Sequence, residues 1–201
     1  MEIFDANDGL RRLYNTISTL SIISDKFEDR STMSDDEEYM QRQVVRYTVQ
    51  ALKKYFEAHL AVKVEEEVNK DLRKDGCSPQ PVQPPYKAHR IEADQMPEQI
   101  FTLLELINYR SRWDPVDQLV RLGGIHTLLQ AAAMSCDSPW PGRAETVKCC
   151  LEILSVCCVS PRVQLMLCDR LELKKYKKIN RHDHKPWISH YPAFLPSRDD
   201  F

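Results

Sequence analysis

Apolar residues in this chain recur three and four positions apart, which is the spacing of one face of an α-helix. In the first such segment they are Leu10, Leu13, Tyr14, Ile17 and Leu20. Glycine is scarce, with 5 in 201 residues, and most of the 12 prolines stand in clusters between the apolar segments. Many tight β-turns would need more glycine. The pattern therefore predicts an all-α fold of long helices separated by breakers.

A long helix is predicted to begin after Ser34. Ser34 stands three residues before Glu37, a spacing at which the hydroxyl and the carboxylate each satisfy a free backbone N–H. This helix is expected to run through about Val64. Its apolar face comprises Val45, Thr48, Val49, Leu52, Tyr55, Phe56, His59 and Leu60, and the residues off this stripe include Lys53, Lys54, Glu57 and Lys63.

The chain divides into a helical segment, 1–172, and a basic, Pro- and His-containing tail, 173–201, that is expected to be irregular. Within the helical segment, about 24–38 is rich in acids and is expected to form a solvated loop. Residues of about 75–97 are predicted to be a linker, because they include clustered prolines, which lack the N–H that a helix needs.

Further helices are predicted beyond Pro97, so that six or seven result in all. Asp114-Pro115 and Ser160-Pro161 each read as an N-cap followed by proline at the first helical position. The apolar stripes of these helices are Ile100, Phe101, Leu103, Leu104 and Ile107, then Val147, Cys150, Leu151, Leu154 and Cys158, then Val163, Met166, Leu167 and Leu171.

Two similar segments indicate a repeated unit. Gly9 and the pair Gly123-Gly124 each precede an apolar helix, with an aliphatic residue next and a leucine three further on. These glycines are the expected structural turns, supplying a positive φ or a close backbone approach. Helical repeats of about 40 residues stack into a solenoid. The alternative is an ordinary helical domain in which the glycines merely end helices.

No residue is assigned a catalytic, cofactor-binding or metal-binding role. The phosphate-binding and nucleophile-elbow glycine motifs are absent. Zinc is the alternative with the most candidates, Cys157, Cys158, Cys168, His182 and His184. Adjacent cysteines inside an apolar helical pattern are instead expected to be reduced, buried thiols. His59 and His126 are expected to be packing residues.

Charge and hydropathy give little support for nucleic acid or a membrane as partner. Lys plus Arg total 28 against 30 for Asp plus Glu, and no apolar run approaches the roughly 20 residues that cross a bilayer. A soluble protein of the nucleus and cytoplasm is expected. A metal- or nucleic-acid-binding function in the tail, where basic and aromatic residues interleave, stays open as an alternative.

Three segments closely resemble the Vpr-binding protein family, a group of cullin-4-associated factors. They are Met1 through Leu13 (MEIFDANDGLRRL), Ala51 through Ala61 (ALKKYFEAHLA) and Pro84 through Ala88 (PPYKA). Weaker similarity from Trp113 through Leu129 and from Thr146 through Leu167 follows the same order. The resemblance covers about residues 1–168 and implies a fragment of an armadillo-like α-solenoid.

The resemblance also implies a function. Full-length relatives serve as substrate receptors, joined to a cullin-4 ubiquitin ligase through the damaged-DNA-binding adaptor. Adaptor docking is implied for a C-terminal propeller region that has no counterpart in this sequence. The expectation is a non-catalytic interaction segment with protein partners, including substrate proteins, and with catalysis by other subunits. The remaining alternative is a truncated product with only a structural role.

Overall fold

The computed structural model describes residues 2–26, 34–76, 95–107, 111–136 and 141–168. These ranges contain helices and no strand. The helices are α1 (Glu2–Ala6), α2 (Gly9–Lys26), α3 (Asp35–Lys74), α4 (Gln95–Leu106), α5 (Asp114–Arg121), α6 (Gly124–Cys136), α7 (Arg143–Cys157) and α8 (Pro161–Cys168). The all-α prediction is confirmed.

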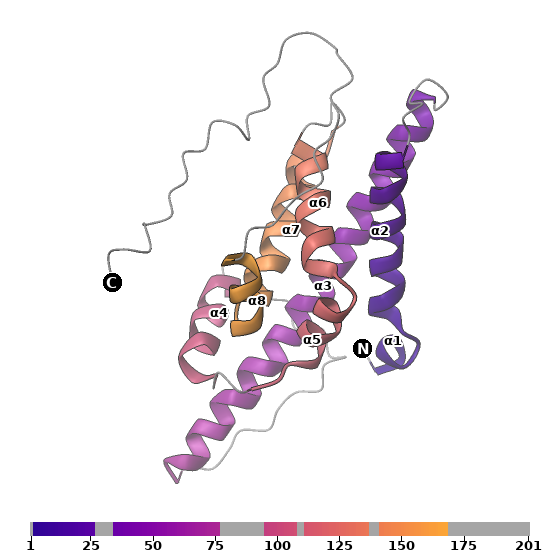
Figure 1. Ribbon diagram of the computed structural model, residues 1–201. Coiled ribbons are helices and arrows are strands. Elements are labelled where there is room, and N and C mark those ends of the chain that lie inside the picture. Colours follow the sequence, from indigo (N-terminus) through magenta and orange to yellow (C-terminus); the bar gives the residue numbers. More distant parts are fainter. Residues whose placement is uncertain (1, 27–33, 77–94, 108–110, 137–140, 169–201) are drawn as a thin grey trace, which may run out of the picture.

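Two similar three-helix units stack side by side. In each, a short helix and a tight turn precede a middle helix, and a further helix packs back on the middle one: α1, α2 and α3, then α5, α6 and α7. Between the units, α2 packs against α6 and α3 against α7. Figure 1 shows α3 running diagonally through the molecule, with α2 on one side and α6 and α7 on the other. This two-layer stack confirms the repeat prediction.

The N-terminus of α3 is the capping box that the sequence predicts. The Ser34 hydroxyl accepts a hydrogen bond from the Glu37 backbone N–H at 3.2 Å, and the Ser34 N–H donates to the Glu37 carboxylate at 3.3 Å. The acidic residues 35–38 therefore form the first turn of the helix, where the helix dipole favours negative charge. The predicted acidic loop at 24–38 is wrong at both ends, because α2 continues to Lys26 and α3 begins at Asp35.

The C-terminal part of α3 extends ten residues past the predicted end near Val64. Ion pairs one turn apart support this extension: Lys63 with Glu67 at 2.8 Å, Lys70 with Glu67 at 2.7 Å and Lys74 with Asp71 at 3.3 Å. Such pairs stabilise a helix without an apolar stripe. The predicted linker also ends early, since α4 already includes Pro97; residues 77–94 lie outside the described ranges.

The glycines expected to form turns share this role with their neighbours in the chain. In the second unit, Gly123 has a φ of 79° and Gly124 lies so close to Leu119 that a Cβ there would overlap the leucine side chain. In the first unit, Asp8 takes the positive φ, at 54°, and a Cβ on Gly9 would meet the ring of Phe4. The two turns therefore use the same device, a left-handed residue followed by a closely packed glycine.

Gly124→Ala is expected to lower the free energy of unfolding by about 1–2 kcal/mol, because the new methyl group overpacks against the buried Leu119 side chain. The matched control is Gly9→Ala, for which we expect a smaller loss, below about 1 kcal/mol. There the obstacle is the ring of Phe4, which is 36% exposed and can shift at the cost of part of its contact with Tyr55. Urea denaturation of both variants measures the difference, and equal losses would contradict this account.

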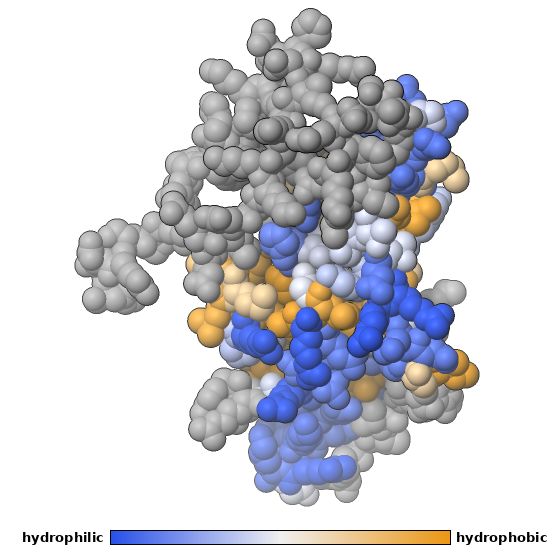
Figure 2. Space-filling model, turned by 45° about the vertical axis from the view of Figure 1, so that its right-hand side comes forward, coloured by the Kyte–Doolittle hydropathy of each residue, from blue (hydrophilic) through white to orange (hydrophobic). Residues whose placement is uncertain are grey.

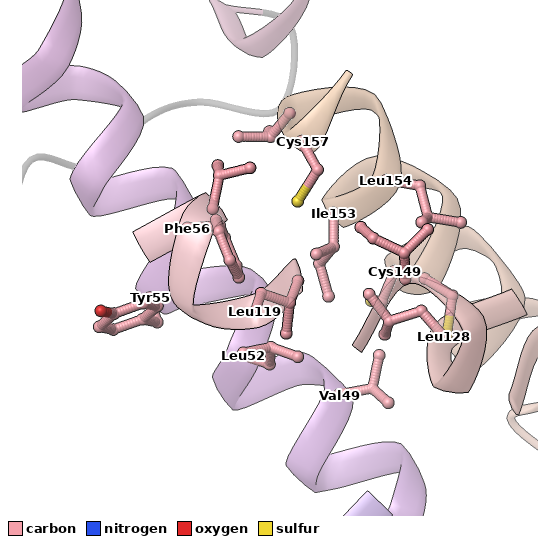
Figure 3. Close-up of a cluster of buried hydrophobic side chains, with 14 of the residues drawn as sticks. Val49, Leu52, Tyr55, Phe56, Leu119, Leu128, Cys149, Ile153, Leu154 and Cys157 are labelled. Atoms are coloured by element: carbon pink, nitrogen blue, oxygen red, sulfur yellow. The ribbon is translucent and has the colours of Figure 1, made fainter. Parts of the chain in front are cut away.

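The core lies where the two units meet. Figure 3 shows Phe56 and Leu52 of α3 among side chains of three other helices, whereas Tyr55 points away from them. The buried residues of this cluster include Val49, Leu52 and Phe56 from α3, Leu119 from α5, Leu128 from α6, and Cys149, Ile153, Leu154 and Cys157 from α7. Because these helices come from both units, neither unit buries its apolar face alone.

Some details of the predicted helices are wrong. The short helix α1 was not predicted, and the N-cap of α5 is Trp113, so that Asp114 is already helical. Phe101 and Leu104 of α4 and Leu151 of α7 are exposed although they stand on predicted apolar stripes. The prediction that Pro161 begins a helix is confirmed.

Candidate protein-binding surface

A row of alternating charges joins α3 to α7. Lys54 Nζ donates to Glu57 Oε2 at 2.7 Å, and Lys53 Nζ lies 3.4 Å from Glu57 Oε1. Lys53 Nζ also lies 2.7 Å from Glu152 Oε2 of α7, whose other oxygen is 3.9 Å from Lys148 Nζ. We call these five residues the charge ladder. Three ammonium groups share two carboxylates, and the two ends of the ladder are lysines.

The middle of the ladder is shielded from water and its ends are not. Burial alone lowers the pKa of the Lys53 ammonium, but the contact with Glu152 and the charge of Glu57 raise it by more, so the pKa lies above its usual value. Lys53 therefore stays charged at neutral pH. The side chains at the ends, Lys54 and Lys148, are 73% and 67% exposed.

A second polar link lies one turn closer to the start of α7. The Glu145 carboxylate accepts a hydrogen bond from Arg46 Nε at 2.7 Å and another from Gln50 Nε2 at 2.6 Å. Arg46 also lies over the ring of Tyr47, 5.6 Å from its centroid. This link pairs one cation with one anion, so it leaves the excess positive charge of the ladder unchanged.

Opposite the core, α3 and α7 each expose one stripe of residues at helical spacing. We call these two stripes together the α3–α7 face. Its members are Met40, Val44, Tyr47, Ala51 and Lys54 on α3, and Ala144, Lys148, Leu151 and Ser155 on α7. Most are apolar or small, and the charged ones are the two end lysines of the ladder. Figure 2 shows hydrophobic residues exposed between hydrophilic ones on the surface of the molecule.

A shallow, open groove of about 750 Å³ follows the α7 stripe. All four α7 members of the face line it, together with Cys136, Arg143, Val147 and Glu152. Leu151, which is 52% exposed, supplies a large apolar surface, and Lys148 supplies a charge beside it. Clefts with a mainly apolar lining and a few polar groups are typical binding sites.

An acidic residue of the N-terminal helix links it to α3. Asp5 accepts a hydrogen bond from the Tyr55 hydroxyl at 2.9 Å, and its other oxygen lies 3.7 Å from His59 Nε2. The rings of Tyr55 and His59 meet edge to face, 4.4 Å apart. His59 Nε2 is buried without a hydrogen-bond partner. Burial lowers the pKa of His59, and the charge of Asp5 offsets only part of this effect.

The free energy of unfolding is therefore expected to fall as the pH drops below about 6.5, the usual histidine pKa. A lowered pKa means that the unfolded chain binds a proton more readily at this site, so its stabilisation is present above that pH and is lost as the pH approaches the folded-state pKa. Denaturation from pH ~7.5 to ~5 measures the slope. His59→Gln should flatten it, and an unchanged slope would exclude His59 as its source.

The residues that sequence reasoning singled out lie mostly away from this surface. Gly9, Gly123 and Gly124 shape turns and do not line the groove. Cys149, Cys150 and Cys157 are buried free thiols, as predicted, whereas Cys158 is only partly buried. Burial raises the pKa of Cys150 to about 12. A thiol with such a pKa stays protonated and is a poor nucleophile or metal ligand.

Two further predictions concern metal binding and the crossing of a membrane. In the ranges that the structure describes, His, Cys, Asp and Glu side chains form no group of three suited to a metal ion. His182, His184 and the rest of the 173–201 tail lie outside those ranges. None of the described helices is both long and apolar enough to span a bilayer.

Comparison with known proteins gives the family. Residues 45–184 match the DCAF1 helical domain. The chain belongs to the DCAF1 helical domain family. The match includes all of α7 and the part of α3 from Val45 onward, and it extends past residue 172 into the expected tail. The predicted membership of the Vpr-binding protein family is thereby confirmed.

A curated member of the family shows how much of a whole protein this chain represents. Protein mahjong of Drosophila melanogaster is 43% identical over 180 residues, which is 85% of this chain and 12% of the relative. The chain therefore spans about one eighth of the length of that relative. No solved structure matches the chain.

Proposed function

We propose that this chain is a non-catalytic interaction segment of a substrate receptor of a cullin-4 RING ubiquitin ligase and contributes to protein ubiquitination. Membership of the DCAF1 helical domain family carries the proposal. Two stacked helical units supply a semi-rigid arm with an exposed groove, which suits a role in holding protein partners.

In such a ligase, substrate binding, adaptor docking and ubiquitin transfer belong to different parts of the assembly. We assign ubiquitin transfer to the catalytic subunits, and docking of the damaged-DNA-binding adaptor and cullin-4 to a propeller region elsewhere in a full-length receptor. This segment holds or positions substrate proteins. Its place of action is the nucleus and cytoplasm.

A segment exchange tests the proposal. Drosophila cells depleted of Protein mahjong would express that protein intact, with the matching segment deleted, or with this chain in its place. We expect all three forms to capture the adaptor and cullin-4. Ubiquitin conjugates of receptor-bound proteins should fall with the deletion and return with the exchange. Conjugates unaffected by the deletion would overturn the proposal, and adaptor capture by this chain alone would overturn the assignment of docking to another region.

A further inference from the structure

The charge ladder carries an unbalanced positive charge at the α3–α7 face. Lys53, Lys54 and Lys148 share the carboxylates of Glu57 and Glu152, and the neighbouring Arg46 and Glu145 cancel one another. Both carboxylates of the ladder are largely buried, whereas its terminal lysines reach into water. A ligand approaching this face therefore meets ammonium groups, and an additional carboxylate would balance the charge.

Apolar side chains flank these lysines. Leu151 follows Lys148 by three positions on α7 and lines the same groove, and Tyr47 precedes Lys54 by seven positions on the same stripe of α3. Exposed large apolar side chains beside charges are typical of protein-binding sites. Such a face selects a ligand that offers apolar and acidic groups together.

We propose that the α3–α7 face binds an acidic segment of a partner protein that also carries a large apolar side chain. The apolar side chain packs on Leu151 in the groove, and carboxylates of the segment pair with Lys148 and Lys54. The inference rests on the proposed function and names the partner chemistry that this function would use.

The charge of the face disfavours two other occupants. A second copy of this chain would bring the same excess of lysines to the contact, so the two faces would repel one another. Nucleic acid is bound by sets of cations that each neutralise a phosphate, whereas the three lysines of the ladder exceed its two carboxylates by only one charge. An acidic, partly apolar protein segment suits both the small excess charge and the groove.

Fluorescence anisotropy with the full 201-residue chain tests the inference. The probe is a short labelled peptide in which glutamates alternate with leucines, and its control carries lysines in place of the glutamates. We expect the acidic peptide to bind, with an affinity that falls as salt is added, and the basic peptide not to bind. The double variant Lys54→Glu with Lys148→Glu should bind the acidic peptide about tenfold more weakly.

Matched variants keep the test specific. Lys74→Glu reverses an equally exposed lysine of α3, which pairs with Asp71 outside the ladder, and should leave binding unchanged. Leu151→Ser should also weaken binding about tenfold, whereas Leu165→Ser on α8 should not. Circular dichroism confirms that each variant is folded.

Several results would overturn the inference: no binding of the acidic peptide, equal binding of the basic peptide, or equal losses in the ladder and control variants. Self-association of the chain that Leu151→Ser abolishes would also overturn it, because the occupant would then be a second copy. If the segment exchange restores ubiquitin conjugates while the peptide does not bind, only the partner chemistry is wrong. Failure of the exchange itself counts against the proposed function.

Discussion

Phe56→Ala is expected to lower the free energy of unfolding by about 3–5 kcal/mol. Phe56 is fully buried at the junction of α3, α5 and α7, so the substitution opens a cavity between the two units. The expected loss is a large share of the total stability of a domain of this size. Urea denaturation measures it, with circular dichroism as the signal of helix loss.

The matched control is Phe101→Ala. Phe101 is 65% exposed on α4, so removing its ring creates no cavity, and the change should stay within about 0.5 kcal/mol. Similar losses for the two phenylalanines would show that the core does not lie between the two units. A loss confined to Phe56 would support a core that lies between the two units, because the neighbours of Phe56 belong to both.

Lys53→Met is expected to cost about 2–3 kcal/mol. The substitution leaves Glu57 and Glu152 facing one another in a shielded site without the ammonium that joins them. The cost is smaller than for a completely buried ion pair, since Glu152 keeps some contact with water. Urea denaturation at neutral pH gives the value.

Lys54→Met is the neighbouring control, because Lys54 is exposed and contacts only one of the two carboxylates. Its cost should be below about 1 kcal/mol. A double-mutant cycle adds a second readout: Glu152→Leu should cost less in the Lys53→Met background than in the original chain, by at least about 1 kcal/mol. Strict additivity would mean that Lys53 and Glu152 do not stabilise one another.

Local patterns in the sequence were enough to predict much of the fold. The capping box at Ser34, the glycine pair at 123–124 and the start of α8 at Pro161 each depend on residues within a few positions of one another. The repeat followed from two such local patterns in the same order. Short-range rules of this kind hold because helix ends and turns satisfy their own backbone groups.

Features that depend on distant parts of the chain could not be predicted. Lys53 and Glu57 have the spacing of a helical ion pair, but their third partner, Glu152, is brought to them only by the stacking of α7 on α3. Leu151 was assigned to a buried stripe because α7 carries apolar residues beyond its packed side. Periodicity identifies apolar residues of a helix without telling which of them a neighbour covers.

Two boundary errors have simple physical reasons. Helix α1 has five residues, fewer than two turns, so no period could reveal it, and it is held mainly by Asp5 and Phe4 contacts to Tyr55. The end of α3 was placed too early because apolar periodicity stops there. Charged pairs such as Lys63 with Glu67 continue the helix instead.

The difference in length between α3 and α7 has a mechanical consequence. At about 1.5 Å per residue, the 40 residues of α3 extend about 60 Å, whereas the 15 residues of α7 extend about 22 Å. Backbone hydrogen bonds fix the length of α3 however its surroundings change. The chain segments that join α3 at Asp35 and at Lys74 therefore stay about 60 Å apart. A small tilt of α3 at its contact with α7 displaces the two ends of the helix by a larger distance.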